Sequence, residues 1–259
     1  MYKRQALLSS GTWSLLGAEL DAPVLDDLAR AYDLTNERGL DGTTRLLKNV
    51  MGLWLVQECR RAWADAGNEL SYAELQRRAA GVGDDVPLFD PDQDGFLAPG
   101  DMPGRVTAAC RRSGQRLDPA PGVVVRSILT SLACKYRLVL ECLESASGLN
   151  FDRVHVVGGG SRNSLLCRLT ADILGRTVVA GPVEATALGN VLVQARAAGE
   201  LSSRSDLHAV ALESAGAEWH EPRAAEGGNS TYQRFLELTG LGVEPAAPTP
   251  ARPTMEITP

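Results

Sequence analysis

An alternation of short apolar runs with longer amphipathic runs over residues 152–198 constrains the fold more than any other feature of the chain. The pattern predicts a strand at Asp152–Val157, which runs into three glycines and then into a helix over Ser161–Leu174. A second strand, Thr177–Ala180, precedes a helix over Ala185–Ala198. Strands that are joined by helices pair in parallel, and the helices pack on the sheet. We therefore predict an α/β fold with a central parallel or mixed sheet.

The start of the chain predicts a β-hairpin with a polar turn. The apolar runs Ala6–Leu8 and Trp13–Leu16 flank the polar residues Ser9–Thr12. Gly11 permits a backbone conformation that exposes successive N–H groups, and the hydroxyl of Thr12 adds a donor. Such a turn suits an anionic oxygen. The alternative is an ordinary hairpin turn that binds nothing.

Helical periodicity and loop composition predict the remaining organisation. The expected helices are one or two turns within Ala22–Ala31, a long helix over Thr43–Ala66, a capped helix over Ser71–Ala80, and another long helix over Val123–Ala146. We expect a loop at Asn36–Gly42, and an irregular insertion at about residues 81–121 that encloses one short helix, Pro103–Ser113. Residues 1–242 then form one domain, and the Pro- and Ala-rich residues 243–259 form a disordered tail.

Composition narrows the class of protein. The 259 residues are enough for a sizeable core, and the net charge of −6 argues against nucleic acid as the main partner. The five cysteines are scattered and include no CxxC pair, so we expect neither a disulfide framework nor a zinc site, and we expect a reducing cytoplasm. The sequence contains neither an apolar run of the ~20 residues that a membrane span needs nor a signal peptide.

The glycine triplet Gly158–Gly160 is a second candidate site. It ends a predicted strand and opens a helix, where backbone can approach a nucleotide closely and helix N–H groups point outward. A dinucleotide fingerprint would require glycine at position 163, where Asn163 stands, and no Lys-Ser or Lys-Thr pair follows as in a phosphate-binding P-loop. The alternative is a tight strand–helix turn that serves packing only.

Two carboxamides form a third candidate. On the helix expected at Thr43–Ala66, Asn49 and Gln57 are spaced i, i+8 and share a face about 12 Å apart along the axis. They could contact opposite ends of an extended ligand, or they could be two surface amides.

The acidic run of residues 90–94 almost matches a calcium loop. Asp90, Asp92 and Asp94 precede Gly95, but Asp101 stands where a bidentate glutamate is needed. Prolines interrupt the segment, so we prefer a solvated acidic turn.

Three segments together resemble a known family. LSSGTWSLLG, NERGLDGTTRLLKNVMGLWLVQECRRAW and HVVGGGSRNSLLCRLTADILGRTVVAGPVEATALGN are similar in content and order to the C-terminal half of the FGGY carbohydrate kinases, most narrowly to its rhamnulokinase branch, from about Leu7 to about Leu236. The resemblance implies the actin-like, ribonuclease-H-like ATPase fold, with a central mixed sheet flanked by helices.

The resemblance also implies residue roles. It assigns ATP binding to Thr12, Gln57 and Gly159, with Gly11, Gly158, Gly160 and Asn163 shaping or lining the same site, and sugar binding to Asn49. The implied reaction transfers the γ-phosphoryl group of ATP, with magnesium, to the 1-hydroxyl group of L-rhamnulose. Such chemistry depends on positioning, charge neutralisation and a base for the attacking hydroxyl.

One departure from the family pattern bears on activity. The family's general base is an aspartate in a His-Asp-Thr segment shortly before the hairpin, whereas Met1–Gln5 contain no acid. We therefore expect a fragment that lacks the N-terminal domain and contains no catalytic residue within these 259 positions. Such a fragment should bind ATP or ADP weakly and should not phosphorylate sugar alone. An apolar surface should be exposed near the hairpin. The alternatives are another FGGY kinase, acting on a different ketose or polyol, and a non-catalytic nucleotide-binding module.

Overall fold

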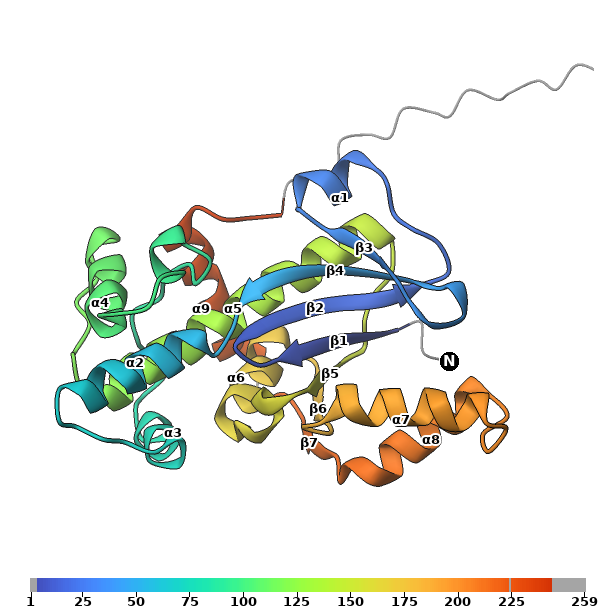
Figure 1. Cartoon of the computed structure of the whole chain (residues 1–259). Coiled ribbons are helices and arrows are strands. Elements are labelled where there is room, and N and C mark those ends of the chain that lie inside the picture. The colour runs from blue at the N-terminus through green and yellow to red at the C-terminus, as the bar shows by residue number, and fades with distance from the viewer. Residues whose placement is uncertain (1–3, 224, 244–259) are drawn as a thin grey trace, which may run out of the picture.

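A seven-stranded mixed sheet forms the centre of the computed structural model, which describes residues 4–223 and 225–243 (Figure 1). The strands lie in the order β3-β4-β2-β1-β5-β6-β7. β1 pairs in parallel with β5, and β5 with β6, whereas the other neighbours are antiparallel. The strands are β1 (Gln5–Ser10), β2 (Trp13–Leu20), β3 (Thr35–Arg38), β4 (Thr44–Met51), β5 (Arg153–Val157), β6 (Thr177–Ala180) and β7 (Glu218–His220). The predicted α/β fold with a mixed sheet is confirmed.

Helices surround this sheet. They are α1 (Asp27–Ala31), α2 (Trp54–Asp65), α3 (Tyr72–Ala80), α4 (Met102–Arg112), α5 (Pro121–Ser147), α6 (Ser164–Leu174), α7 (Ala185–Ala197), α8 (Arg204–Ala215) and α9 (Ala225–Thr239), with 3-10 turns η1 (Leu40–Gly42), η2 (Asp94–Phe96) and η3 (Gly159–Arg162). In Figure 1, α5 lies behind the strands, α7 and α8 lie below them, and α2 to α4 gather beyond the ends of β1 and β4. None of the described helices is long and apolar enough to cross a membrane.

The core lies between α5 and one face of the sheet. Pro121 begins this helix and Gly148, with φ 69°, follows its last turn. Because successive strand side chains point to opposite faces, every second residue of a central strand meets the helix layer. Leu8, Leu16 and Val50 are such residues, and each is at most 1% exposed. This burial explains why α5 is apolar along almost its whole length.

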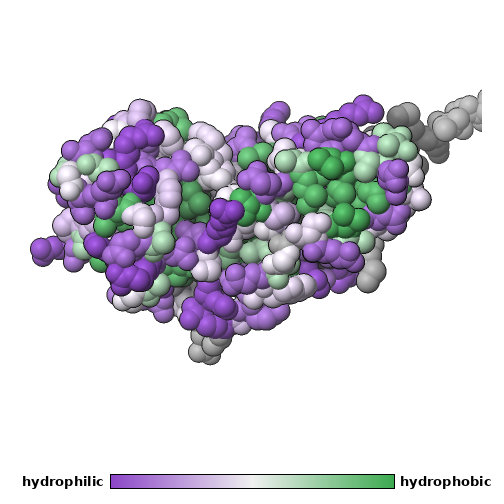
Figure 2. All heavy atoms as spheres, turned by 60° about the horizontal axis from the view of Figure 1, so that its bottom comes forward, coloured by the Kyte–Doolittle hydropathy of each residue, from purple (hydrophilic) through white to green (hydrophobic). Residues whose placement is uncertain are grey.

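The other face of the sheet is partly open. Leu7 and Trp13 are 45% and 48% exposed, at the place where we expected an exposed apolar surface. On α7, Val191 is exposed and Leu192 is the buried residue. Figure 2, which brings the side of α7 and α8 forward, shows a hydrophobic area over this pair of helices. The domain therefore presents apolar side chains on the side that lies away from α5.

The long helix predicted over Thr43–Ala66 is wrong. Residues 44–51 form strand β4, and the helix begins only at Trp54. Leu46 and Val50 fit a helical period and also the alternation of a strand, and pairing of β4 with β2 and β3 decides the matter. Gly52 then separates the strand from α2. The shared helix face of the two carboxamides, with its 12 Å spacing, is wrong for the same reason.

Smaller differences have similar causes. The predicted loop at Asn36–Gly42 contains most of β3, a four-residue polar strand that exists through its pairing with β4. The helix predicted from Ser161 begins at Ser164, because a 3-10 turn follows the glycines. Residues 199–242, for which we predicted no elements, hold α8, β7 and α9. Val243 packs against the core, and residues 244–259 of the predicted tail lie outside the described residues.

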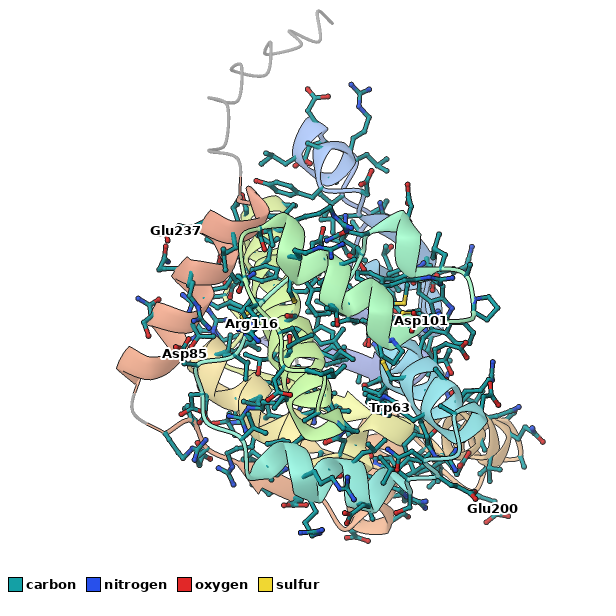
Figure 3. All side chains as sticks on the ribbon, turned by 90° about the vertical axis from the view of Figure 1, so that its left-hand side faces the viewer. Trp63, Asp85, Asp101, Arg116, Glu200 and Glu237 are labelled. Atoms are coloured by element: carbon teal, nitrogen blue, oxygen red, sulfur yellow. The ribbon has the colours of Figure 1, made fainter. Side chains whose placement is uncertain are left out.

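The insertion at residues 81–121 is irregular, as predicted, and contains η2 and α4. Figure 3 looks onto the end of the molecule where α2, α3 and α4 pack around α5, with Trp63 on α2 and Asp101 at the start of α4 labelled. Buried insertion residues such as Leu88 and Phe96 join the main core. The insertion is therefore part of the domain and not a separate excursion.

The acidic turn in this insertion is not solvated as we expected. Asp90 and Asp92 are 21% and 24% exposed and both contact the ammonium group of Lys135, which is 8% exposed, at 2.9 and 3.1 Å. Burial disfavours the ammonium, but the two carboxylates outweigh it and raise the pKa of Lys135. Only Asp94 of the three aspartates is exposed. A buried lysine charge thus offsets part of the negative charge of the turn.

The Ser14–Tyr136 hydrogen bond is expected to stabilise the fold measurably. The two oxygens are 2.7 Å apart, both side chains are fully buried, and burial raises the pKa of Tyr136 to about 12, so its hydroxyl stays protonated. Tyr136→Phe leaves Ser14 without this partner and should lower the free energy of unfolding by about 1–2 kcal/mol. Urea unfolding measures the change. Tyr72→Phe, on an exposed ring of α3, is the control and should change nothing.

Candidate functional site

The hairpin turn and the glycine triplet lie against each other. Because β1 and β5 are parallel neighbours, the turn after β1 and the loop after β5 emerge at the same edge of the sheet. A Cβ atom on Gly160 would lie 2.0 Å from Ser10 Oγ, and one on Gly158, whose φ is 83°, would lie 2.8 Å from the Ser10 carbonyl oxygen. The structure therefore requires both glycines for packing, whatever else they do.

Gly159 is different from its two neighbours. It is exposed, its φ lies outside the left-handed region, and a Cβ atom on it would meet no described atom within 4 Å. Packing within the protein therefore does not require glycine at this position. A bare backbone in open space, beside a packed turn, is suited to a ligand that approaches the main chain closely.

The same turn is held from another direction by the start of α2. Leu53 N–H donates to the Gly11 carbonyl at 2.8 Å, and Trp54 N–H donates to the Thr12 carbonyl at 3.1 Å. A Cβ atom on Gly52 would lie 2.6 Å from the Thr12 carbonyl oxygen, so only glycine fits there. These bonds satisfy helix N–H groups that have no partner within the helix. The sequence analysis did not single out Gly52, although a glycine in the middle of the predicted helix already argues against a continuous helix.

This contact brings together two residues that the sequence singled out separately. Thr12 Oγ1 donates to Gln57 Oε1 at 3.2 Å, from the turn to the second turn of α2. Thr12 is exposed and Gln57 half-buried. Their polar atoms face the same side of the molecule, next to the main chain of the turn.

Asn49 lies apart from this pair, on β4. It stands opposite Leu15 on β2, and its side chain is exposed. Because Lys48 and Val50 lie on the face toward α5, the alternation of the strand places Asn49 on the open face. The two carboxamides of the sequence analysis therefore belong to different elements, Asn49 to strand β4 and Gln57 to helix α2.

Asn163 has a structural role that the sequence analysis did not predict, and its role in nucleotide binding stays a prediction. Its side-chain oxygen accepts from Leu166 N–H at 3.0 Å and caps α6. Gln76 Nε2 of α3 donates to Ser164 Oγ at 2.8 Å and covers the same helix start. The amide group of Asn163 remains available as a donor, and the α6 N-terminus is more occupied than we expected.

The site holds no cluster of metal ligands of its own. Across residues 4–223 and 225–243, no group of three or more His, Cys, Asp or Glu side chains could hold a metal ion. All five cysteines are free and buried. What this edge offers is the open main chain at Gly159, the Thr12 hydroxyl and two carboxamides. The Gly11 N–H, which we expected to be exposed, already donates to the Trp13 carbonyl at 2.9 Å.

Comparisons with known proteins agree with this architecture. The chain is 43% identical over 230 residues to a rhamnulokinase from Bacteroides thetaiotaomicron, covering 89% of this chain and 47% of that protein. It is 41% identical over 205 residues to a rhamnulokinase from Enterobacter sp. (strain 638), covering 79% of this chain and 41% of that protein. The chain thus spans about half the length of the curated relatives it matches.

Solved structures show the same fold. Xylulose kinase from Rhodospirillum rubrum superimposes with a TM-score of 0.69 at 21% identity, over 92% of this chain and 47% of that chain. Plasmodium falciparum glycerol kinase with ADP gives 0.62 at 15% identity, over 91% and 47%. The fold is therefore the actin-like, ribonuclease-H-like ATPase fold of these sugar kinases. Residues 6–198 match the C-terminal domain of the FGGY family of carbohydrate kinases, and the chain belongs to that family.

Proposed function

We propose that this domain binds ATP or ADP and forms the nucleotide-binding half of an ATP-dependent sugar kinase. The observation that carries the proposal is the open backbone of Gly159 beside the Gly11–Thr12 turn. Phosphate groups need donors and close main-chain approach, and both are present at this edge. Family membership supports the same reading of the geometry.

Each residue then has a role set by its contacts. Thr12 binds the nucleotide phosphates through its hydroxyl, whose proton points to Gln57 Oε1 in the free protein and turns to a phosphate oxygen, and Gly11 shapes the turn through its own main-chain bonds. Gly159 lets the nucleotide lie against the loop that Gly158 and Gly160 shape. Gln57, oriented by Thr12, contacts the nucleotide from α2, and the amide of Asn163 adds a donor at the start of α6. These are positioning and charge-stabilising roles, which dominate phosphoryl transfer.

Magnesium fits this site as a companion of the nucleotide. Mg²⁺ keeps several waters and is commonly held by substrate phosphates with few protein ligands. The Thr12 hydroxyl oxygen and the Gln57 amide oxygen are oxygen atoms of this edge that could ligate the ion, and the phosphates would supply ligands that do not come from the protein. Bound magnesium would supply neutralisation of the phosphate charge.

The sugar side of the site is proposed on Asn49. This residue is exposed on the open sheet face, two positions before the strand ends. We infer L-rhamnulose as the substrate and its 1-hydroxyl group as the acceptor, because the relatives named above are rhamnulokinases. Another ketose or a polyol is the alternative, since the structural neighbours include xylulose and glycerol kinases. The five reduced, buried cysteines agree with a cytoplasmic setting.

A second lobe completes the site in this proposal. The relatives are about twice as long as the matched region, and Leu7 and Trp13 leave apolar surface exposed beside the candidate site. A lobe that covers this face would supply the catalytic base and most of the sugar pocket, and closure would exclude water from the reaction. The catalytic base and the sugar pocket of this second lobe are part of the proposal.

Gly159→Ala should weaken nucleotide binding without loss of stability. The added methyl group meets only open space in the free protein, but it occupies the surface proposed for the nucleotide. We expect the dissociation constant for ADP to rise about tenfold, by calorimetric titration. Gly83→Ala, at an equally open and exposed glycine, is the matched control and should leave affinity unchanged. Gly160→Ala should instead lower the melting temperature, because Ser10 blocks the new side chain.

Thr12→Val tests the hydroxyl without changing the shape of the side chain. Thr12 is exposed, so unfolding in urea should move little. We expect affinity for ADP to fall by about tenfold, the value of one hydrogen bond to a charged group. Thr231→Val, which removes a hydroxyl from the distant helix α9, is the control. Equal affinities for the Thr12 and Thr231 variants would contradict the proposed phosphate contact.

The 259-residue chain is expected to bind nucleotide but not to turn over sugar. The reason is that the proposed base and most of the sugar pocket belong to the other lobe. A coupled assay of ADP release with MgATP and L-rhamnulose measures turnover, and calorimetry measures ADP binding by the same sample. Turnover at ordinary kinase rates, of the order of 10 s⁻¹, would overturn the two-lobe proposal. Binding without turnover in any longer form of the chain would favour a non-catalytic nucleotide-binding module.

A further inference from the structure

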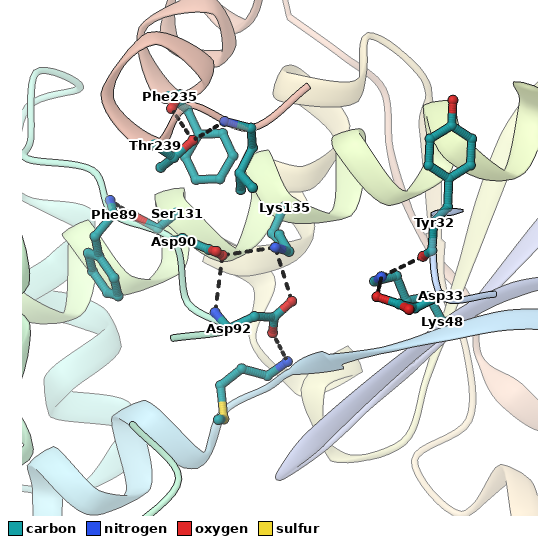
Figure 4. Close-up of polar contacts among 12 residues, drawn as sticks. Tyr32, Asp33, Lys48, Phe89, Asp90, Asp92, Ser131, Lys135, Phe235 and Thr239 are labelled. Atoms are coloured by element: carbon teal, nitrogen blue, oxygen red, sulfur yellow. Dashed lines mark hydrogen bonds and ion pairs between the residues drawn. The ribbon is translucent and has the colours of Figure 1, made fainter. Parts of the chain in front are cut away.

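The acidic segment at residues 90–92 touches the candidate site through the end of β4, and no role proposed above uses it. Figure 4 shows Asp90 and Asp92 on one side of Lys135, with Asp92 reaching on to the strand. Asp92 Oδ2 accepts from Lys135 Nζ at 3.1 Å, and Asp92 Oδ1 accepts from the Met51 N–H at 2.7 Å. One carboxylate therefore joins α5 to the last residue of β4.

The carboxylate of Asp92 accepts a hydrogen bond there that a neighbouring strand would otherwise accept. β3 pairs with β4 only over Thr44–Leu47, so the outer edge of β4 continues past the end of β3. Met51 has the same parity as Leu47, whose carbonyl accepts from Thr35 Oγ1 of β3, so the Met51 N–H points to that outer edge. The carboxylate of Asp92 satisfies this N–H, which a strand carbonyl would otherwise have to do.

Met51 is also where β4 passes into α2. The next residue, Gly52, presses on the carbonyl oxygens of the hairpin turn, and Leu53 and Trp54 donate to them. The junction of residues 51–54 is thus held by Asp92 on one side and by the turn on the other. Asn49 precedes this junction by two residues, and Gln57 follows it by three.

We propose that Asp92, oriented by Lys135, is a positioning residue that fixes the β4–α2 junction and with it the placement of Gln57 relative to Asn49. The proposal rests on the nucleotide and sugar roles proposed above for these two residues. Asp92 touches neither nucleotide nor sugar, and it acts through the main chain of Met51.

Only a carboxylate suits this position. Two donors, the Lys135 ammonium and the Met51 N–H, face the two oxygens of Asp92. An asparagine has one acceptor oxygen and one NH2 group, so it must lose either the contact with Met51 N–H or the contact with the Lys135 ammonium. Asp90 offers a matched contrast, because its Oδ1 alone accepts both from Lys135 and from the Asp92 N–H. Asparagine at position 90 can keep both of these contacts.

The test compares D92N with D90N in the 259-residue chain. Amide hydrogen exchange of Leu53 and Trp54, followed by NMR, measures the grip of the junction on the turn, and calorimetry with ADP measures binding. D92N should speed exchange at these two amides about tenfold beyond what its change in global stability explains, and should weaken ADP binding about tenfold. D90N should change each quantity by less than about twofold, since its contacts survive.

A second variant keeps the proposal testable if D92N does not fold. D92L/K135M removes the buried ammonium together with the carboxylate that binds Met51, whereas Asp90, which is 21% exposed, loses its lysine partner but keeps solvent and the main-chain N–H of residue 92. It also removes the acceptor for Met51 N–H, so exchange at Leu53 and Trp54 should again be fast.

Two outcomes overturn the proposal. Equal changes in D92N and D90N would make the acidic turn a general stabilising element, and unchanged exchange at Leu53 and Trp54 in either Asp92 variant would remove its hold on the junction. If the unmodified chain does not bind ADP, the proposed nucleotide function fails, whereas the exchange data still decide whether Asp92 positions the junction.

Discussion

The hairpin turn after β1 is approached by two other segments more closely than any side chain would permit, and the rest of the candidate site depends on this contact. Gly158 and Gly160 press on Ser10, and Gly52 presses on the carbonyl of Thr12. Protein interiors are packed too densely to accommodate an added methyl group at these three glycines without a shift of the neighbouring atoms. Three segments from distant parts of the sequence therefore meet here, main chain against main chain at Gly52 and Gly158 and against the Ser10 side chain at Gly160.

This arrangement divides the glycine triplet into two kinds of position. The outer two glycines serve the protein's own packing, and the middle one faces open space. The nucleotide proposal thus assigns stability to the outer two glycines and ligand affinity to the middle one. A packing-only interpretation of the triplet accounts for Gly158 and Gly160 but leaves Gly159 without a reason, and the nucleotide proposal supplies one.

Sequence reasoning succeeded where the signal was local and failed where pairing with distant strands decided the structure. β6 and α5 follow from their apolar runs and terminal Pro and Gly residues, and they lie where they were predicted within one or two residues. β4 fails because its apolar residues fit two periods, and β3 because a polar four-residue run has no intrinsic preference that reveals a strand. The contact of Thr12 with Gln57 follows from a topology that no local pattern contains. The lysine that pairs with the acidic turn is 43 residues away from Asp92, so local sequence patterns could not reveal its role.

The two sides of the proposed site differ in how complete they are within this chain. On the nucleotide side, the turn is held by main-chain bonds from α2 and by close contact with the glycine loop. Such preorganisation fixes the main chain of the turn, so that only the Thr12 hydroxyl has to turn from Gln57 toward an anion. On the sugar side, Asn49 projects from an open sheet face, and half-exposed Leu7 and Trp13 lie on neighbouring strands. A ligand pocket normally buries most of its ligand, and one strand face cannot do so. The geometry thus supports a domain that is organised for nucleotide by itself and needs a covering surface for sugar.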